Sequence, residues 1–401
     1  MKTSLKIAIF SGAIPSTTFI EHLIDGVAKH HQVLLFGVIE KEKHYESKNI
    51  RVYKTPYSHI LNLCYTVWRL LKLGFTRPKD VIKLFKEISK YNRLYDKWIW
   101  FSKFLPIILY RPDIFHMQWT RDLEFYTFLK TRFDIPMVVS LRGAHMHYTP
   151  IVLPYIADVY RAIFPAIDRF HAVSESMSQA AQHFGAQKKQ IQVIHSPISK
   201  SVLGQYLTYK KNATSFRIGF VGRFHWVKGV RYAFEACTIL NSQKFDYNFT
   251  VVSSNTPTEE VLFKLNQLQL QNSVNIKSEL SQEKLFEVMK SFDVLLLPSL
   301  NEGIANVVLE AMAMGIPVIS TDCGGMSEVV INNTTGWLVP IRDPKAIAKA
   351  IVEVSETSEQ EIQRITQNAH NFVKKHFNAD NSIKKFLELY EDVISQGLND
   401  S

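Results

Sequence analysis

Short apolar runs alternate with helix-like segments along most of the 401 residues, and this alternation restricts the fold more than any other feature. Runs such as Leu5–Ser11 and Met137–Leu141 have the length of buried strands and lead into loops with polar residues. Parallel strands need a long crossover between them, so the alternation is typical of α/β proteins. The sequence therefore predicts an α/β fold with parallel sheets, in which ligands bind at the carboxyl ends of the strands.

The alternation is interrupted once, by a polar stretch that has neither a helical nor a strand period. This stretch, Leu203–Ser215, precedes a fresh strand at Phe216–Val221, after which strands and helices alternate again. The chain length also suggests two domains, at roughly 150 residues each. We therefore predict two doubly wound, Rossmann-like halves that face one another, the first over residues 1–205 and the second from residue 206.

Composition excludes several classes of protein. Hydrophobic residues make up 46% of the chain and charged residues 21%, which excludes a disordered or collagen-like chain. Three widely separated cysteines, Cys64, Cys237 and Cys323, cannot build a disulfide framework or a closed zinc site. The N-terminal apolar run is too short for a signal peptide, and no run approaches the roughly 18–20 residues of a membrane span. We expect a cytoplasmic protein.

The positive charge is concentrated in the first half. The net charge is +10, and residues 1–205 hold 28 basic against 15 acidic residues. Residues 41–111 alone hold 16 basic and 5 acidic residues, interleaved with 14 aromatic ones. Such a stretch can face nucleic acid, an anionic lipid surface or an acidic substrate, or it can simply be a solvated surface.

One helix in this basic stretch is amphipathic. Pro78–Lys90 begins with a proline at a helix start and places Val81, Leu84, Phe85 and Ile88 on one face, with lysines opposite. The helix could lie on an anionic membrane. The simpler alternative, which we favour for the helix taken alone, is that its apolar face packs on its own domain.

The densest group of candidate site residues follows a predicted strand at 293–297. The loop there contains Glu302, and a helix is expected from Asn306 to Met314, before Gly315 and Pro317. Glu302 lies beside the helix N-terminus and Glu310 more than one turn inside it. Five residues between them offer backbone N–H groups without an intrahelical acceptor, which favours a bound phosphate. They are Gly303, Ile304, Ala305, Asn306 and Val307.

A carboxylate within such a helix can accept hydrogen bonds from the two hydroxyls of a ribose, as the acidic residue of a dinucleotide fold does. Taken singly, Glu302 could instead complement only the helix dipole, and Glu310 could be a solvated helix residue. A second group opens the same half of the chain, where Gly222-Arg223 is followed by Lys228-Gly229. Arginine and lysine can neutralise a diphosphate, and the glycines let the backbone approach it.

Together these two groups resemble the retaining glycosyltransferases of family four. The shared motifs are Gly-Arg-x4-Lys-Gly over 222–229 and Glu-Gly-x6-Glu over 302–310. The resemblance continues through Gly315–Ile319, Gly324–Glu328 and Asn333–Val339, and so covers most of residues 216–375. The first half matches more loosely, through Pro112–His116 and His171–Glu175.

The resemblance implies the GT-B fold, with the active site in the cleft between two Rossmann-like domains. The donor domain would be 206–375, and a helix at about 376–401 would pack back on the N-terminal, acceptor-binding domain. Arg223 and Lys228 would bind the donor diphosphate and stabilise the charge on the leaving phosphate, and Glu310 would hold the ribose. Glu302 and the N–H groups of 303–307 would contact the donor sugar and phosphates. Neither an enzyme nucleophile nor a catalytic metal is expected, and the only small-molecule requirement is a nucleotide sugar such as a UDP- or GDP-sugar.

The first half departs from the family pattern in two loops. The loop after the first strand has Gly12 where the family often has a glycine pair, and we expect Gly12 to contact the donor. Many members have His-Gly-x-Asp where this chain has Arg142-Gly143-Ala144-His145. Arg142 and His145 are candidates for contacts to the acceptor or the donor sugar. His145 and His147 resemble a metal-binding pair, but no third ligand is evident.

These observations predict a retaining hexosyltransferase that uses a nucleotide sugar. Its acceptor would be a glycan or a lipid-linked oligosaccharide in surface polysaccharide synthesis, and residues 41–111 could hold the enzyme on the inner face of a membrane. One alternative is a sugar-nucleotide epimerase on the same fold, which would use water as the acceptor. Another is a basic nucleic-acid-binding protein without catalytic activity, whose affinity should fall steeply with salt. No nucleic-acid-binding motif supports this second alternative, so we expect no nucleic-acid partner.

Overall fold

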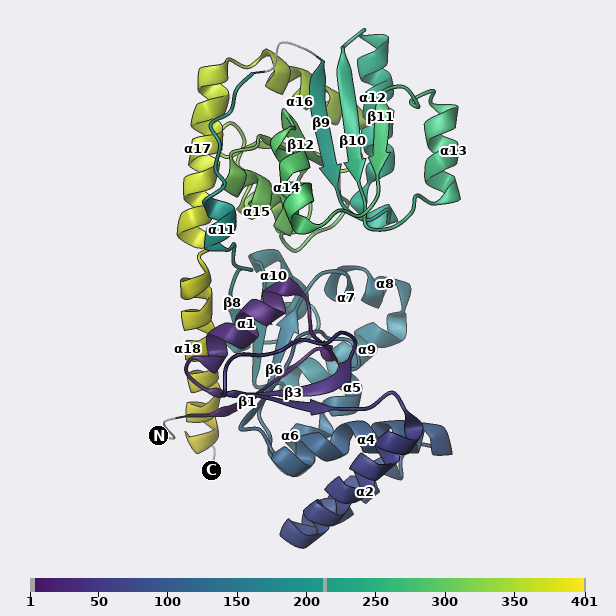
Figure 1. The fold of residues 1–401 in the computed structure, drawn as a ribbon, viewed down its shortest axis with the longest axis vertical. Coiled ribbons are helices and arrows are strands. Elements are labelled where there is room, and N and C mark those ends of the chain that lie inside the picture. The colour runs from purple at the N-terminus through teal and green to yellow at the C-terminus, as the bar shows by residue number, and fades with distance from the viewer. Residues whose placement is uncertain (1–3, 212–214, 400–401) are drawn as a thin grey trace. The chain divides into compact units, whose positions relative to one another are not determined.

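The computed structural model describes residues 4–211 and 215–399, which form two compact units that each contain one parallel sheet (Figure 1). The first unit contains the chain up to Val173, Met177–Ile194 and the chain from Asp380 onward. The second unit contains Ser174–Ser176 and His195–Ala379. The predicted α/β architecture with parallel sheets is confirmed.

The first unit has an eight-stranded sheet in the order β2-β3-β1-β5-β6-β7-β8, with β4 paired to β3. Every pairing is parallel, so the carboxyl ends of β1, β5 and β6 lie at one edge. The strands are β1 (Lys6–Phe10), β2 (Gly12–Ile14), β3 (Gln32–Ile39), β4 (Ile50–Lys54), β5 (Ile114–Met117), β6 (Met137–Leu141), β7 (Arg169–Ala172) and β8 (Ile191–Val193).

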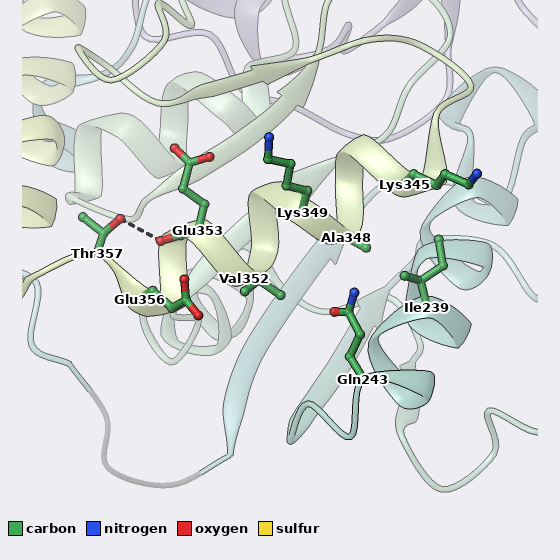
Figure 2. Close-up of a pocket in the computed structure, with 9 residues that line it drawn as sticks. All are labelled: Ile239, Gln243, Lys345, Ala348, Lys349, Val352, Glu353, Glu356 and Thr357. Carbon is green, nitrogen blue, oxygen red and sulfur yellow. Dashed lines mark hydrogen bonds between the residues drawn. The ribbon is translucent and has the colours of Figure 1, made fainter.

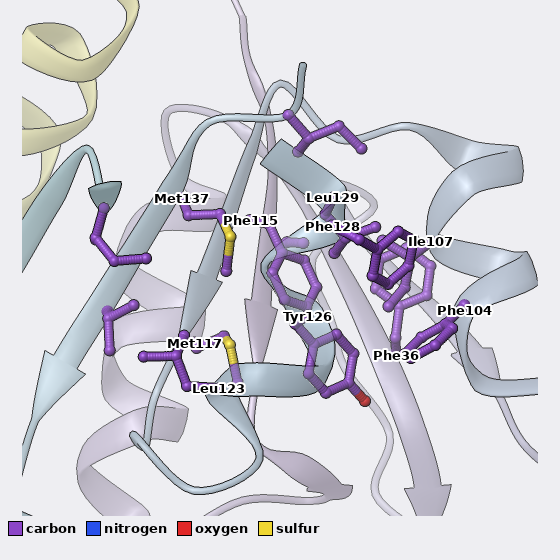
Figure 3. Close-up of a cluster of buried hydrophobic side chains, with 14 of the residues drawn as sticks. Phe36, Phe104, Ile107, Phe115, Met117, Leu123, Tyr126, Phe128, Leu129 and Met137 are labelled. Atoms are coloured by element: carbon purple, nitrogen blue, oxygen red, sulfur yellow. The ribbon is translucent and has the colours of Figure 1, made fainter. Parts of the chain in front are cut away.

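Helices cover both faces of this sheet. Helices α1 and α18 pack on one face through residues such as Ile20 and Phe386. On the other face, Phe115 of β5 packs among aromatic side chains that include Phe104 and Tyr126 (Figure 3). The helices are α1 (Thr18–Ala28), α2 (His59–Thr76), α3 (Pro78–Ile88), α4 (Leu94–Tyr110), α5 (Leu123–Tyr126), α6 (Phe128–Phe133), α7 (Ala144–His147), α8 (Thr149–Val152), α9 (Pro154–Ile163), α10 (Glu175–Gln182) and α18 (Ala379–Asn399), with short 3₁₀ turns at Phe164–Ala166 and Lys188–Gln190.

A chain of buried hydrogen bonds joins α18 to the sheet of the first unit. Tyr390 Oη lies 2.7 Å from His116 Nδ1, and His116 Nε2 lies 2.9 Å from Ser140 Oγ. Ser140 Oγ is 2.8 Å from His171 Nδ1, whose Nε2 is 2.8 Å from the Ile194 carbonyl oxygen. A carbonyl can only accept, so each group must donate in turn from Tyr390 to Ile194. For neutral imidazoles, this fixes the direction of every bond and the tautomer of both histidines.

The second unit has a six-stranded parallel sheet in the order β11-β10-β9-β12-β13-β14. Alternate residues of β12 enter different cores, since Leu296 packs with α12 and α16 whereas Leu297 packs with α14 and α15. Both faces are thus covered. The strands are β9 (Phe216–Val221), β10 (Tyr247–Val252), β11 (Val274–Lys277), β12 (Val294–Leu297), β13 (Val318–Thr321) and β14 (Trp337–Val339). The helices are α11 (Lys200–Leu203), α12 (Val230–Ser242), α13 (Glu259–Gln267), α14 (Gln282–Lys290), α15 (Asn306–Met314), α16 (Pro344–Glu356) and α17 (Glu359–His376), with 3₁₀ turns at Trp226–Lys228 and Met326–Glu328.

The two units divide between Ile194 and His195, eleven residues before the end of the first domain as predicted from the sequence. The physical reason is local packing, because Ile198 and Val202 lie in the same core as Phe377 of the second unit. Ile198 also forms a β-bridge with Asn378. Among the described helices, none combines the length and the apolar composition needed to cross a bilayer.

Candidate functional site

The loop after β9 is held by the end of the neighbouring strand β10. The backbone N–H of the buried Phe224 donates to Asn255 Oδ1 at 2.8 Å, and Asn255 Nδ2 donates to the Phe224 carbonyl at 3.2 Å. A 3₁₀ turn follows at Trp226–Lys228, and its Val227 N–H donates to His225 Nδ1 at 3.3 Å. These bonds fix the positions from which Arg223 and Lys228 leave the backbone.

The same loop packs directly against the loop after β12. The Leu300 N–H donates to the Val227 carbonyl at 2.7 Å. Gly229 has a φ of +63°, and a Cβ at this position would overlap the carbonyl oxygen of Pro298. Only glycine fits such a position without strain. The Gly222–Gly229 segment and the 299–303 loop are thus joined backbone to backbone at the carboxyl edge of the sheet.

Lys228 and Glu302 form an ion pair across these two loops. Lys228 Nζ lies 2.6 Å from Glu302 Oε1, which also accepts a hydrogen bond from Ser299 Oγ at 2.8 Å. Both side chains are largely covered, with 22% and 13% of their surfaces exposed. The structure therefore brings together two residues that the sequence predicted for one site.

Helix α15 begins at Asn306, four residues after Glu302. The Gly325 N–H donates to the Glu302 carbonyl at 3.1 Å, so the loop after β13 holds the 302 backbone in place. In the described part of the chain, the N–H groups of Gly303, Ile304, Asn306 and Val307 donate to no protein acceptor. Ala305 differs from the prediction, because its buried N–H lies 3.4 Å from the sulfur of Met326. Four of the five predicted donors remain available to an anion.

Glu310 lies one turn further along α15 and is half-buried. Burial raises the pKa of its carboxyl group to about 7. Within residues 4–211 and 215–399, Glu310 forms no hydrogen bond or ion pair. A partly desolvated carboxylate without a partner gains most from a ligand that donates hydrogen bonds to it.

Arg223 is exposed, and the described residues offer it no ion pair. The pKa of the nearby His225 is lowered, first by burial and then by the positive charges of Arg223 and Lys228. Lys228 is paired with Glu302, so Arg223 is the charge of this loop that remains available to an anionic ligand.

In the first unit, Gly12 and Arg142 lie at the carboxyl edge of the sheet, just after β1 and β6, and His145 follows within α7. Gly12 has a φ of +86°, and a Cβ there would meet open space. The residues around it line a hollow of about 340 Å³ together with Trp119, which follows β5. His145 is half-buried next to Trp119, and burial, then the charge of Arg121, lower its pKa.

Arg142 is buried without a carboxylate partner. Only 8% of the residue is exposed, and its guanidinium lies over the Phe19 ring at 4.3 Å. Within the described chain its sole polar contact is a long one, 3.4 Å from Nη2 to Gln118 Oε1. Arg142 Nε and Gln118 Nε2 are buried donors that find no acceptor among the described residues. Burial lowers the pKa of Arg142 to about 9, so an acceptor that satisfies these donors would be stabilising.

Two further features lie apart from these groups. No described set of three or more histidine, cysteine, aspartate or glutamate side chains is arranged to hold a metal ion. A shallow hollow of about 760 Å³ lies between α12 and α16 (Figure 2). Its charged lining is balanced, since it contains Lys345, Lys349, Glu353 and Glu356, and it contains none of the predicted site residues.

Sequence reasoning gave no role to several residues that shape these groups. Ser299 forms a side-chain hydrogen bond with Glu302, and Asn255 accepts one from the backbone of Phe224. Gln118 lies beside Arg142, and Trp119 lies beside His145. Each follows a strand directly or within three residues. Their position after a parallel strand was the available signal, but it does not show which side chains meet.

The chain is similar to known glycosyltransferases over most of its length. Residues 16–201 match the family described as Glycosyltransferase Family 4, and residues 215–357 match Glycosyl transferases group 1. WcaL of Escherichia coli K12 is 28% identical over 60% of this chain and 58% of its own length. It is named as a colanic acid biosynthesis glycosyltransferase. The amylovoran biosynthesis glycosyltransferase AmsK of Erwinia amylovora is 29% identical over 44% of each chain. These alignments thus span about half the length of the two relatives.

The same fold occurs among solved structures. Anabaena HepE in complex with UDP and glucose superposes with a TM-score of 0.65, at 17% identity, over 96% of this chain and 98% of its own. At this level of identity the likeness shows the fold, which is GT-B.

Proposed function

The chain belongs to the group 1 glycosyltransferases of family 4, and from this we propose that it transfers a hexose-type sugar from a nucleotide diphosphate to a glycan or lipid-linked acceptor, with retention of configuration. We place the reaction in the cytoplasm and in surface polysaccharide synthesis, the kind of pathway named for WcaL and AmsK. The observation that carries the proposal is the joined pair of loops in the second unit, where Lys228, Glu302 and the start of α15 meet.

This group has the chemistry that a nucleotide diphosphate needs. Arg223 and Lys228 supply positive charge, and four free N–H groups at the start of α15 supply hydrogen-bond donors for phosphate oxygens. Glu310 supplies a carboxylate for the two ribose hydroxyls. HepE, which shares the fold, was crystallised with UDP and glucose, and a UDP-sugar is the first donor to test.

The reaction breaks the bond between the sugar C1 and the phosphate oxygen and forms a bond from C1 to the acceptor oxygen on the same face. The acceptor proton passes to the leaving phosphate, so no side chain has to act as a nucleophile. Arg223, Lys228 and the N–H groups stabilise the charge that develops on the phosphate. This arrangement requires neither a metal nor a resident cofactor.

The acceptor or the donor sugar would contact the residues at the edge of the first sheet. Arg142 Nε and Gln118 Nε2 are buried donors that an oxygen-rich group can satisfy. His145 and the loop around Gly12 lie at the same sheet edge. We assign these residues to the sugar side of the reaction.

A thermal-shift screen against UDP, GDP, ADP and their sugar conjugates tests the donor pocket. We expect one nucleotide family to stabilise the wild-type protein, and the shift to be lost in Glu310→Ala. The conservative Glu310→Gln variant keeps the volume and separates loss of charge from loss of packing. A folded protein that no nucleotide stabilises would contradict the proposal.

A further inference from the structure

The outer face of α2 is apolar and exposed. Of the 23 large apolar side chains that are exposed in the described chain, 13 lie between Val52 and Tyr95. Six of them form a stripe along α2, with Phe75 88% exposed. The stripe consists of Ile60, Leu63, Val67, Trp68, Leu71 and Phe75. Exposed apolar patches of this kind mark interaction surfaces.

The inner face of the same helix is polar. Four residues of α2 are buried by the rest of the first unit, and three of them are polar. They are Asn62, Thr66, Arg69 and Leu73. Arg69 is 3% exposed and donates from Nη2 to the Lys54 carbonyl at 3.0 Å, but its Nε and Nη1 have no acceptor in the part of the chain that the structure describes. A helix that packs on its own domain in water normally has the opposite arrangement. The inverted pattern indicates that the outer face of α2 is adapted to an environment other than water.

Helix α3 does not share this property. Leu84 and Ile88 are buried in the core of the first unit, and Phe85 packs against Phe101. The apolar face of this amphipathic helix is therefore mostly covered by its own domain, as in the simpler of the two interpretations of its sequence. Figure 1 shows α2, by contrast, extending away from the sheet of its unit.

The segment that carries the stripe has an excess of positive charge. Lys72 Nζ lies over the Trp68 ring at 5.2 Å, so its aliphatic part follows the apolar face while its ammonium stays at the edge. Residues 41–111 hold 16 basic and 5 acidic residues. This charge complements an anionic surface, whereas a second copy of the chain would bring like charges together. Tryptophan and lysine at the edge of an apolar face are typical of helices at a membrane interface.

We propose that the stripe on α2 binds the surface of an anionic lipid bilayer, with the helix lying in the headgroup region. Apolar side chains enter the boundary with the acyl chains, and Lys72 and other basic residues of the same segment contact the lipid headgroups. The binding does not depend on the transferase reaction, so it can be measured without a donor or an acceptor.

Flotation of the full chain with vesicles tests this proposal. We expect the protein to float with phosphatidylglycerol-containing vesicles roughly tenfold better than with pure phosphatidylcholine vesicles, and less well at high salt. A Trp68→Ser/Phe75→Ser variant should lose roughly tenfold or more of this binding. The matched control is Leu262→Ser/Phe263→Ser on α13, which removes two exposed apolar side chains from the second unit and should leave binding unchanged.

A fluorescent label on Cys64 adds a local readout. Cys64 is exposed on α2, whereas Cys237 and Cys323 are buried, so an environment-sensitive dye reacts selectively there. We expect its emission to shift to the blue with anionic vesicles only. Failure to float, equal flotation with both lipids, or loss of self-association instead of lipid binding in the α2 variant would each overturn the proposal. Circular dichroism establishes that the variants are folded.

Discussion

The ammonium of Lys228 lies 2.6 Å from the carboxylate of Glu302. We assign Lys228 to the binding of the donor diphosphate. In the protein without a ligand, its positive charge is therefore neutralised by an acidic neighbour. The diphosphate brings further negative charge to this pair, which Arg223 and the start of α15 can balance. We infer that Glu302 then keeps the lysine in place until the leaving phosphate develops its charge.

Replacement of Lys228 should therefore reduce the rate more than the affinity. We expect Lys228→Ala to lower kcat by roughly 10²–10³-fold, the usual effect of removing one donor to a developing negative charge. Lys228→Arg should recover part of the rate, since it restores the charge. Steady-state kinetics with the nucleotide sugar found in the thermal-shift screen measure both. A variant that changes only KM would instead assign Lys228 to ground-state binding.

Gly229 should tolerate no side chain. Alanine at this position adopts an unfavourable positive φ and overlaps the Pro298 carbonyl, so we expect Gly229→Ala to lower the free energy of unfolding by about 2 kcal/mol or more. The joint between the two loops would be displaced, and nucleotide binding would be lost. Gly74→Ala in α2 is the matched control, because a Cβ there meets open space. It should be stabilising by about 0.5–1 kcal/mol in a chemical denaturation experiment.

Much of the second unit could be predicted from local sequence signals. The strand at 216–221 and the helix at 306–314 have the predicted bounds, because a short apolar run and a C-terminal glycine are signals contained in the segment itself. The strand β4 was missed, since its residues Ile50–Lys54 are largely exposed at the sheet edge and show no apolar run. Helix α4 was missed because Pro106 lies inside it.

The candidate site shows the same division. The sequence placed Lys228 and Glu302 at the ends of parallel strands, so their common edge could be predicted. Their contact joins residues that are 74 positions apart, and it depends on how two loops pack. The inverted faces of α2 could not be predicted either, because the sequence does not show which face the domain covers.

Tyr390 should stabilise the first unit through its bond to His116. Tyr390→Phe leaves the buried Nδ1 of His116 without a donor, which costs about 1–3 kcal/mol. We expect a lower melting temperature at neutral pH, measured by calorimetry. Tyr155→Phe, which removes an exposed hydroxyl from the same unit, is the control and should melt like the wild type. Equal melting of all three proteins would show that water replaces the tyrosine hydroxyl.

Arg142 should be more important for activity than for stability. Its guanidinium is buried, and no carboxylate of the described residues pairs with it, so Arg142→Met removes a desolvated charge at similar volume. We expect an unchanged or higher melting temperature together with roughly 10²-fold lower transfer. Arg142→Lys keeps a charge but not the planar group, and it should remain impaired. A strongly destabilised Arg142→Met protein would show that the arginine has a structural role instead.

Nucleotide-sugar affinity should depend on pH through Glu310, whose carboxyl pKa is raised to about 7 by burial. Ribose hydroxyls donate to the ionised form, so the bound ligand lowers this pKa and binding releases a proton below about pH 7. Affinity should therefore rise about tenfold per pH unit below the pKa and level off above it.

A UDP-sugar is the suitable ligand, because it has no terminal phosphate group that titrates in this range. Isothermal titration between pH 5.5 and 8.5 in buffers of different ionisation enthalpy measures both the affinity and the released proton. In Glu310→Gln, which cannot ionise, the affinity should be weaker and nearly independent of pH between these limits. If the variant kept the pH dependence of the wild type, another group would be responsible, and the ribose would have to be assigned elsewhere.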